Sequence, residues 1–257
     1  MVLIWFFLLG SVIGSFINVV VFRLHSKESI TRGRSKCPSC GHQLAVKDLV
    51  PVVSFLLLRG RCRYCGNLIS WQYPLVELGV AILFTIVGFY HLGFLASFLD
   101  SNLFILFRDL LAVSALTTLF IYDLRFMEIP DEISLPTIVA CFLLGILGGM
   151  DWRIMLVSAF IGLGFFLLQY LVSAGKWIGG GDLRLGFLMG VLLNWTSLIF
   201  AIFLSYVIGS IFALWLLITG KAGRKAQLPF GAFLAPATIF SIFFGQRIVD
   251  WYLNLLR

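Results

Sequence analysis

The sequence is poor in charge. Only 12% of its 257 residues are Asp, Glu, Lys or Arg, whereas 60% are hydrophobic, and the mean hydropathy is +1.02. Soluble domains carry about a quarter of their residues as charges, so this composition excludes an ordinary soluble protein. A transmembrane helix needs roughly 20 mainly apolar residues, and much of the chain meets that demand. We therefore expect an all-α polytopic protein embedded in a lipid bilayer.

Acidic residues are scarce relative to basic ones, 12 against 19, which gives a formal charge of +7. Such an excess would suggest nucleic acid in a soluble protein. In a membrane protein Lys and Arg collect in cytoplasmic loops, so no nucleic-acid partner is needed to explain it. The N-terminus also lacks the basic start and small-residue cleavage site of a secretory signal, so residues 2–22 are expected to remain as a span.

Long hydrophilic stretches are almost absent, and the one that exists covers residues 23–72. It holds nine of the nineteen basic residues but only two acidic ones, Glu28 and Asp48. The positive-inside rule places this loop in the cytoplasm and Met1 outside.

Basic residues recur at Lys176 and Arg184, and again at Lys221, Arg224 and Lys225. If both groups are cytoplasmic, the chain crosses an even number of times between them. The interval 179–219 then divides at 194–196 into two spans, the first of which begins near a run of glycines.

About eight transmembrane helices follow from this reasoning. After the loop they are expected at residues 74–94, 103–122, 133–150 and 154–174, at two places within 179–219, and at 233–252. Asp123 and Asp182 then share the cytoplasmic side of the membrane.

Cysteine is rare, but four of the five cysteines form two C-x-x-C pairs in the long loop, Cys37 with Cys40 and Cys62 with Cys65. This spacing is typical of a four-cysteine structural zinc site. A disulfide or thiol redox function and unliganded cysteines are the alternatives, although a reducing cytoplasm disfavours disulfides. Cys141, alone in an apolar run, is expected to be a small core residue.

Two further features flank the cysteine pairs. Residues 47–58 are apolar but too short for a confident span, and they are expected to lie along the membrane surface. Glu77 follows Pro74 near the start of the next span. There it either stabilises the helix N-terminus, where an anion is favoured, or belongs to a site.

An acidic residue at the mouth of an apolar run is a functional-site hypothesis. Asp182 follows Gly179, Gly180 and Gly181, and Asp123 lies just past the end of an earlier run. If the two carboxyl groups meet, they share one proton, so that one accepts a proton while the other donates. Hydrolysis of a peptide bond by water requires this combination. The glycines would let an extended substrate backbone approach.

Other interpretations remain open at this point. Asp182 could be a helix cap, and Asp123 with Arg125 a solvated pair. A secondary transporter also uses inward-facing aspartates on helices broken by glycine. A zinc-bearing membrane assembly scaffold is a third possibility.

The motifs together resemble the bacterial type IV prepilin peptidases, which are intramembrane aspartyl proteases of the GxGD type. The resemblance covers nearly the whole chain. It lies in residues 14–24, 37–65, 69–77, 123–131, 179–182 and 228–234.

The resemblance implies cleavage of basic leaders from prepilins and pseudopilins at the cytoplasmic face of the bacterial inner membrane. It implies that Asp123 and Asp182 are catalytic, with Gly179, Gly180, Gly181 and Arg184 supporting the substrate site.

The resemblance also implies that Cys37, Cys40, Cys62 and Cys65 bind Zn²⁺, and that S-adenosylmethionine serves as methyl donor in N-methylation of the new N-terminus. Residues 1–24 would be the first transmembrane helix, 25–73 the cysteine loop associated with methyl transfer, and 74–257 the protease core. The loop has no Gly-rich turn after a strand that would mark a nucleotide fold. The sequence predicts no particular oligomeric state.

Overall fold

The computed structural model describes residues 1–92, 102–221 and 228–256. They are mainly helical, with two isolated β-bridges, Lys36–Gln43 and Arg61–Leu68, in the cysteine loop. The chain divides into two compact units, Met1–Ser101 and Asn102–Arg257.

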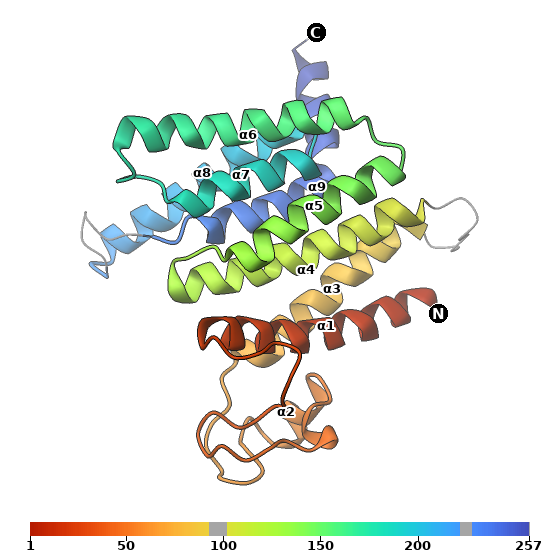
Figure 1. Ribbon diagram of the computed structural model, residues 1–257, viewed down its shortest axis with the longest axis vertical. Coiled ribbons are helices and arrows are strands. Elements are labelled where there is room, and N and C mark those ends of the chain that lie inside the picture. Colours follow the sequence, from red (N-terminus) through yellow and green to blue (C-terminus); the bar gives the residue numbers. More distant parts are fainter. Residues whose placement is uncertain (93–101, 222–227, 257) are drawn as a thin grey trace. The chain divides into compact units, whose positions relative to one another are not determined.

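The first unit is built on a pair of long helices, α1 (Val2–His25) and α3 (Gln72–Leu92), which lie side by side (Figure 1). Glycines allow their close approach. A Cβ on Gly10 would lie 2.7 Å from Ala81 Cα, and one on Gly14 would lie 2.7 Å from Glu77 Cα. Small residues four positions apart often allow membrane helices to pack closely.

Buried polar side chains link this helix pair to the loop between them. Asn18 is 1% exposed, and its Oδ1 accepts a hydrogen bond of 3.1 Å from Gln72 Nε2. Glu77 Oε2 accepts one of 2.7 Å from the main-chain N–H of Val52. Glu77 lies beyond the first turn of α3, so the helix-start interpretation of this residue was wrong. Its hydrogen bond with Val52 attaches the loop to α3.

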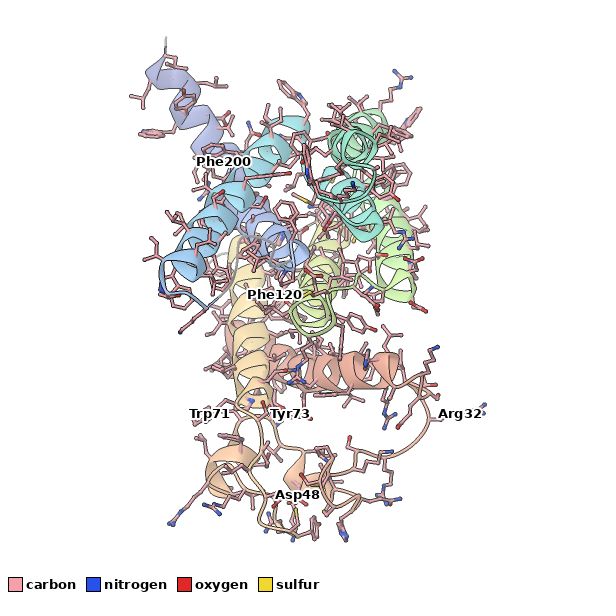
Figure 2. The ribbon with its side chains drawn as sticks, turned by 90° about the vertical axis from the view of Figure 1, so that its left-hand side faces the viewer. Arg32, Asp48, Trp71, Tyr73, Phe120 and Phe200 are labelled. Carbon is pink, nitrogen blue, oxygen red and sulfur yellow. The ribbon has the colours of Figure 1, made fainter. Side chains whose placement is uncertain are left out.

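The loop contains two short helices, η1 (Val46–Asp48) and α2 (Val53–Leu57). Asp48, labelled in Figure 2, accepts hydrogen bonds from Arg63 Nε at 2.7 Å and from the Tyr64 hydroxyl at 3.0 Å. The bond from Arg63 is the main reason why the pKa of Asp48 lies below its usual range. Asp48 therefore joins η1 to the second cysteine pair.

The second unit contains α4 (Leu103–Phe126), α5 (Asp131–Leu147), α6 (Trp152–Ser173), α7 (Gly180–Leu192), α8 (Trp195–Ile218) and α9 (Gly231–Leu255). Its core includes Phe166, Leu185, Met189 and Leu198, all fully buried. Cys141 is also fully buried in this core, as predicted.

The short helix α7 packs tightly against α6 through glycines. The Cβ position of Gly162 collides with the main-chain oxygen of Gly186, and that of Gly190 collides with Ala159 Cα. With 13 residues, α7 is about 20 Å long, less than the roughly 30 Å of hydrocarbon in a bilayer.

The all-helical membrane fold is confirmed, but the count of eight spans is not. Six described helices are long and apolar enough to cross a membrane: α1, α3, α4, α6, α8 and α9. Helices form at the other two predicted positions, but α5 and α7 have only 17 and 13 residues. Residues 93–94 of the predicted second span, together with Arg224 and Lys225, lie outside the described residues.

The helices of the second unit alternate in direction. At one end, on the left in Figure 1, α4, α6 and α8 finish, and α5, α7 and α9 begin. Arg125, Lys176, Arg184 and Lys221 belong to the segments that meet there. α7 and α8 thus run in opposite directions between these basic residues, as expected from their distribution.

We predict that Gly14→Ala destabilises the first unit. The added methyl group would collide with main-chain atoms of α3, which cannot move as a flexible side chain can. Overpacking of this kind costs about 1–3 kcal/mol. The matched control is Gly79→Ala in α3, where nothing lies within 4 Å of the added Cβ. Thermal unfolding in detergent should give a lower Tm for Gly14→Ala only; equal values would contradict the close approach.

Candidate active site and metal centre

Asp123 lies in the last turn of α4, buried to 5% exposure. Its Oδ2 accepts a hydrogen bond of 2.8 Å from the main-chain N–H of Ala232, in the first turn of α9. A Cβ on Gly231 would lie only 2.9 Å from the same oxygen. The carboxyl group therefore sits at a helix N-terminus, where free N–H groups and the helix dipole favour negative charge.

Asp182 lies in the first turn of α7 and is 8% exposed. Its Oδ2 accepts a hydrogen bond of 3.1 Å from the main-chain N–H of Gly179. The carboxyl group thus caps its own helix, which was one of the alternative interpretations of the sequence. Capping does not exclude chemistry, because a carboxyl group has a second oxygen.

The structure brings these two acidic residues to one place. Ile129, in the turn between α4 and α5, is the common neighbour. A Cβ on Gly181 would lie 2.8 Å from Ile129 Cβ, and one on Gly231 would lie 3.1 Å from Ile129 Cδ1. The charges of Asp123 and Asp182 are also close enough to interact. Ile129 therefore packs against the starts of both α7 and α9, and the two buried carboxyl groups lie at this end of the unit.

Arg184 and the glycines have separate roles in this geometry. Arg184 forms an ion pair with Asp131, the first residue of α5, and both side chains are partly exposed. This pair joins α7 to α5 at the margin of the site. Gly181 is tightly packed, whereas a Cβ on Gly180 would meet nothing within 4 Å.

An aromatic cluster, which the sequence did not predict, lies beside the acidic residues. The ring of Phe230 lies 4.9 Å from that of Tyr206, whose hydroxyl donates a 2.7 Å hydrogen bond to Gln169 Oε1. Tyr206 also interacts electrostatically with Asp182. In the sequence, Gln169 and Tyr206 are polar residues in two separate apolar runs. That pattern does not indicate that the two side chains contact each other.

The arrangement can support acid–base chemistry. Two carboxyl groups that are poorly hydrated and close together disfavour double ionisation, so one is expected to keep its proton. One group can then accept a proton while the other donates.

The four loop cysteines also come together. Their Sγ atoms all lie within 4.8 Å of one another, and those of Cys37 and Cys65 are 4.0 Å apart. A zinc tetrahedron with Zn–S bonds of about 2.3 Å places sulfurs about 3.8 Å apart, so the cluster fits such an ion. The thiols are free rather than paired in disulfides. Burial opposes ionisation of Cys37, but hydrogen bonds from the main chain of Cys40 and Ser39 and from the thiols of Cys62 and Cys40 together lower the pKa to about 7.

The two cysteine pairs adopt the same turn. Gly41 and Gly66 have φ angles of +72° and +73°, and their N–H groups donate to the carbonyl oxygens of Cys37 and Cys62, each at 2.9 Å. A positive φ is easily adopted only by glycine. The repeated turn directs each pair of sulfurs toward the same point.

Two family models match the chain. The bacterial peptidase A24 N-terminal domain matches residues 8–91, within the first unit, and the type IV leader peptidase family matches residues 110–214, within the second. The cysteines lie in the first match, and Asp123 and Asp182 lie in the second. The functional boundary expected after residue 73 stays a prediction.

Several relatives share the name prepilin leader peptidase/N-methyltransferase. The Bacillus subtilis protein is 32% identical over 252 residues, 97% of each chain. The Myxococcus xanthus protein is 35% identical over 230 residues, 87% of this chain and 66% of its own. The Aeromonas salmonicida protein is 31% identical over 286 residues, 97% of this chain and 93% of its own.

No solved structure matches the chain. The two family models cover both units, and the relatives match over most of the chain. The chain therefore belongs to the type IV leader peptidase family.

Proposed function

We propose that this protein is a membrane aspartyl endopeptidase that removes the leader peptide of type IV prepilins and pseudopilins, and that it then N-methylates the new N-terminal residue. Membership of the leader peptidase family and the shared name of its relatives support both reactions. The observation that carries the peptidase proposal is the pair of buried carboxyl groups, Asp123 and Asp182, which are close enough to interact.

In the proposed mechanism, the ionised carboxylate takes a proton from water as the water oxygen attacks the scissile carbonyl carbon. The protonated carboxyl group donates its proton to the carbonyl oxygen. When the tetrahedral intermediate collapses, the C–N bond breaks and the leaving amine takes a proton from the first carboxyl group. The hydroxyl proton of the intermediate returns to the second carboxyl group, so the pair ends in its starting state.

The surroundings suit this reaction. The N–H of Ala232 holds Asp123, and the N–H of Gly179 holds Asp182, so both carboxyl groups are oriented before substrate binds. The side of α7 at Gly180 is open, which supports the approach of an extended substrate backbone. The Tyr206 hydroxyl and its acceptor, the Gln169 side chain, offer polar groups beside Phe230.

We place the active site on the cytoplasmic side of the inner membrane and the N-terminus outside. The support is the gathering of basic residues in the segments at the acidic end of the second unit and in the cysteine loop. On that side a basic leader could rest against anionic headgroups while the apolar segment behind it enters the bilayer.

The cysteine loop, residues 25–73, is proposed to bind one structural Zn²⁺ through Cys37, Cys40, Cys62 and Cys65. The spacing of the four sulfurs supports this ligand set. When bound, the ion would close a tetrahedral shell and hold together a loop with little core of its own. S-adenosylmethionine is proposed as methyl donor because the relatives' name includes N-methyltransferase. Residues 74–257 would supply the protease core.

We predict that Asp123→Asn and Asp182→Asn each reduce prepilin cleavage by at least about 100-fold, because an amide can neither accept nor supply the transferred proton. Both variants should still insert into the membrane. Cleavage is measured by mass spectrometry of the prepilin N-terminus after incubation with and without S-adenosylmethionine. Asp151→Asn, at the exposed N-cap of α6, is the control. Cleavage at the wild-type rate by either test variant would refute the assignment.

Gly181→Ala should impair cleavage more strongly than Gly180→Ala. A Cβ at residue 181 would press against Ile129 and shift the start of α7, whereas residue 180 has free space. We expect a loss of about 10-fold or more for Gly181→Ala, corresponding to at least about 1.4 kcal/mol in the barrier. Initial rates for the two variants, compared at equal amounts of folded protein, test this; equal losses would show that Ile129 does not set the position of Asp182.

Elemental analysis of protein purified without chelator should find about one zinc per chain. The double substitution Cys37→Ser with Cys62→Ser removes one ligand from each pair and should abolish retention. Cys141→Ser, in the core of the other unit, should keep the metal. Metal-free wild-type protein would contradict the zinc assignment.

A further inference from the structure

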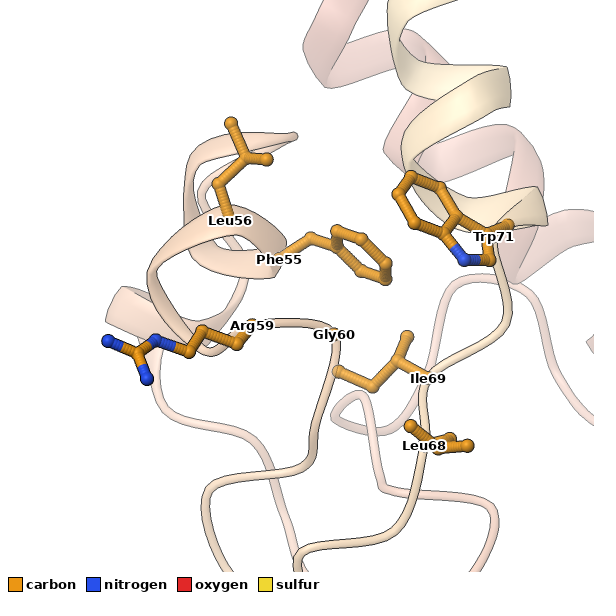
Figure 3. Close-up of a pocket in the computed structure, with 7 residues that line it drawn as sticks. All are labelled: Phe55, Leu56, Arg59, Gly60, Leu68, Ile69 and Trp71. Atoms are coloured by element: carbon orange, nitrogen blue, oxygen red, sulfur yellow. The ribbon is translucent and has the colours of Figure 1, made fainter.

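A pocket of about 320 Å³ lies between α2 and the start of α3, and none of the four cysteines lines it. Figure 3 shows the side chains around it. They are Phe55, Leu56, Arg59, Gly60, Leu68, Ile69 and Trp71.

Two aromatic rings and a tight turn form this pocket. The ring of Phe55, which is buried, lies 4.9 Å from that of Trp71. Arg59 and Gly60 have φ angles of +51° and +68° and reverse the chain after α2. A Cβ on Gly60 would lie 3.1 Å from Phe55 Cζ, so a larger residue there would press on this ring.

The lining has the pattern of a site for an amphiphile. Arg59 is the only charged residue among the seven, and in Figure 3 its guanidinium extends away from the two rings. The apolar side chains remain open to contact: Leu56 is 64% exposed, Leu68 77% and Trp71 66%. Exposed apolar groups grouped around a pocket favour an apolar occupant, and a cation beside them favours an anion.

The position of the pocket in the chain places it at a membrane surface. Trp71 immediately precedes α3, which begins at Gln72 and is long and apolar enough to span a bilayer. Tryptophan at the end of a span is typical of the membrane–water interface. On the same loop Val53 and Leu57 are 49% and 78% exposed, which extends the apolar surface along α2.

We propose that this pocket binds an anionic phospholipid of the membrane that α3 crosses. An acyl chain contacts Phe55, Leu68 and Trp71, and the headgroup phosphate pairs with Arg59. Bound lipid holds α2 at the membrane surface. Val52, next to α2, donates its N–H to Glu77 of α3. The cysteine loop would therefore be held in two ways, by the bound lipid at α2 and by this hydrogen bond to the membrane helix.

The methyl donor does not fit this lining. S-adenosylmethionine carries a sulfonium cation, ribose hydroxyls and an adenine that require hydrogen-bond acceptors and donors. The seven lining residues include no carboxylate, side-chain amide or hydroxyl, and their one charge is positive. The lining therefore favours a lipid over the methyl donor.

The test measures binding of phosphatidylglycerol and phosphatidylcholine to the full-length, delipidated protein by native mass spectrometry. Arg59→Gln should bind phosphatidylglycerol about five-fold more weakly, the loss expected for one cation at an anionic surface. Arg32→Gln, an exposed position in the same loop labelled in Figure 2, should not change binding. Leu68→Gln should weaken binding of both lipids, whereas Val46→Gln, equally 77% exposed but outside the pocket, should not.

A second readout locates the acyl chain. The fluorescence of Trp71 is the difference between the emission of the wild type and that of Trp71→Phe. Phosphatidylglycerol with brominated acyl chains should quench this fluorescence, and Leu68→Gln should reduce the quenching. The proposal is overturned if Arg59→Gln and Arg32→Gln behave alike, if both lipids bind equally to the wild type, or if Trp71 is not quenched. It is also overturned if Leu68→Gln loses S-adenosylmethionine while lipid binding is unchanged.

Discussion

The structure depends on burying two acidic side chains, Asp123 and Asp182, inside a membrane protein. An isolated carboxylate is costly at low dielectric. Here each carboxyl group receives a main-chain N–H at the start of a helix, Asp123 from α9 and Asp182 from α7. The N-terminus of a helix offers unpaired donors and a favourable dipole, so it can orient a carboxyl group and leave it able to exchange protons.

This arrangement requires helices to approach closely, and small residues make the approach possible. Gly231 lets the start of α9 reach Asp123, Gly181 lets α7 reach Ile129, and Gly162 faces Gly186 where α6 meets α7. In a lipid environment close packing and hydrogen bonds replace the hydrophobic drive between helices. The position of a short helix such as α7 is therefore set by its neighbours, which also set the position of Asp182.

Much of the site could be inferred from the sequence because charge and spacing are strong signals in an apolar chain. The distribution of basic residues predicted two helices of opposite direction where α7 and α8 lie, and the cysteine spacing indicated the cluster that the structure forms. The contacts that complete each site could not be inferred, because they join residues without a distinctive pattern. Ile129 and the Tyr206–Gln169 pair are examples, as is the bond between Glu77 and Val52. Hydrophobicity also did not reveal that α5 and α7 would be short.

The central claim is that Asp123 and Asp182 act as one unit, and a double variant tests it most directly. Groups that share a single catalytic task show strongly non-additive losses when they are removed together. Residual single-turnover cleavage rates of Asp123→Asn, Asp182→Asn and the double variant should be compared over long incubations. The account predicts that the double variant cleaves within a few-fold of the slower single variant. If the fold-loss of the double variant equals the product of the two single losses, a shared role for the two carboxyl groups is contradicted.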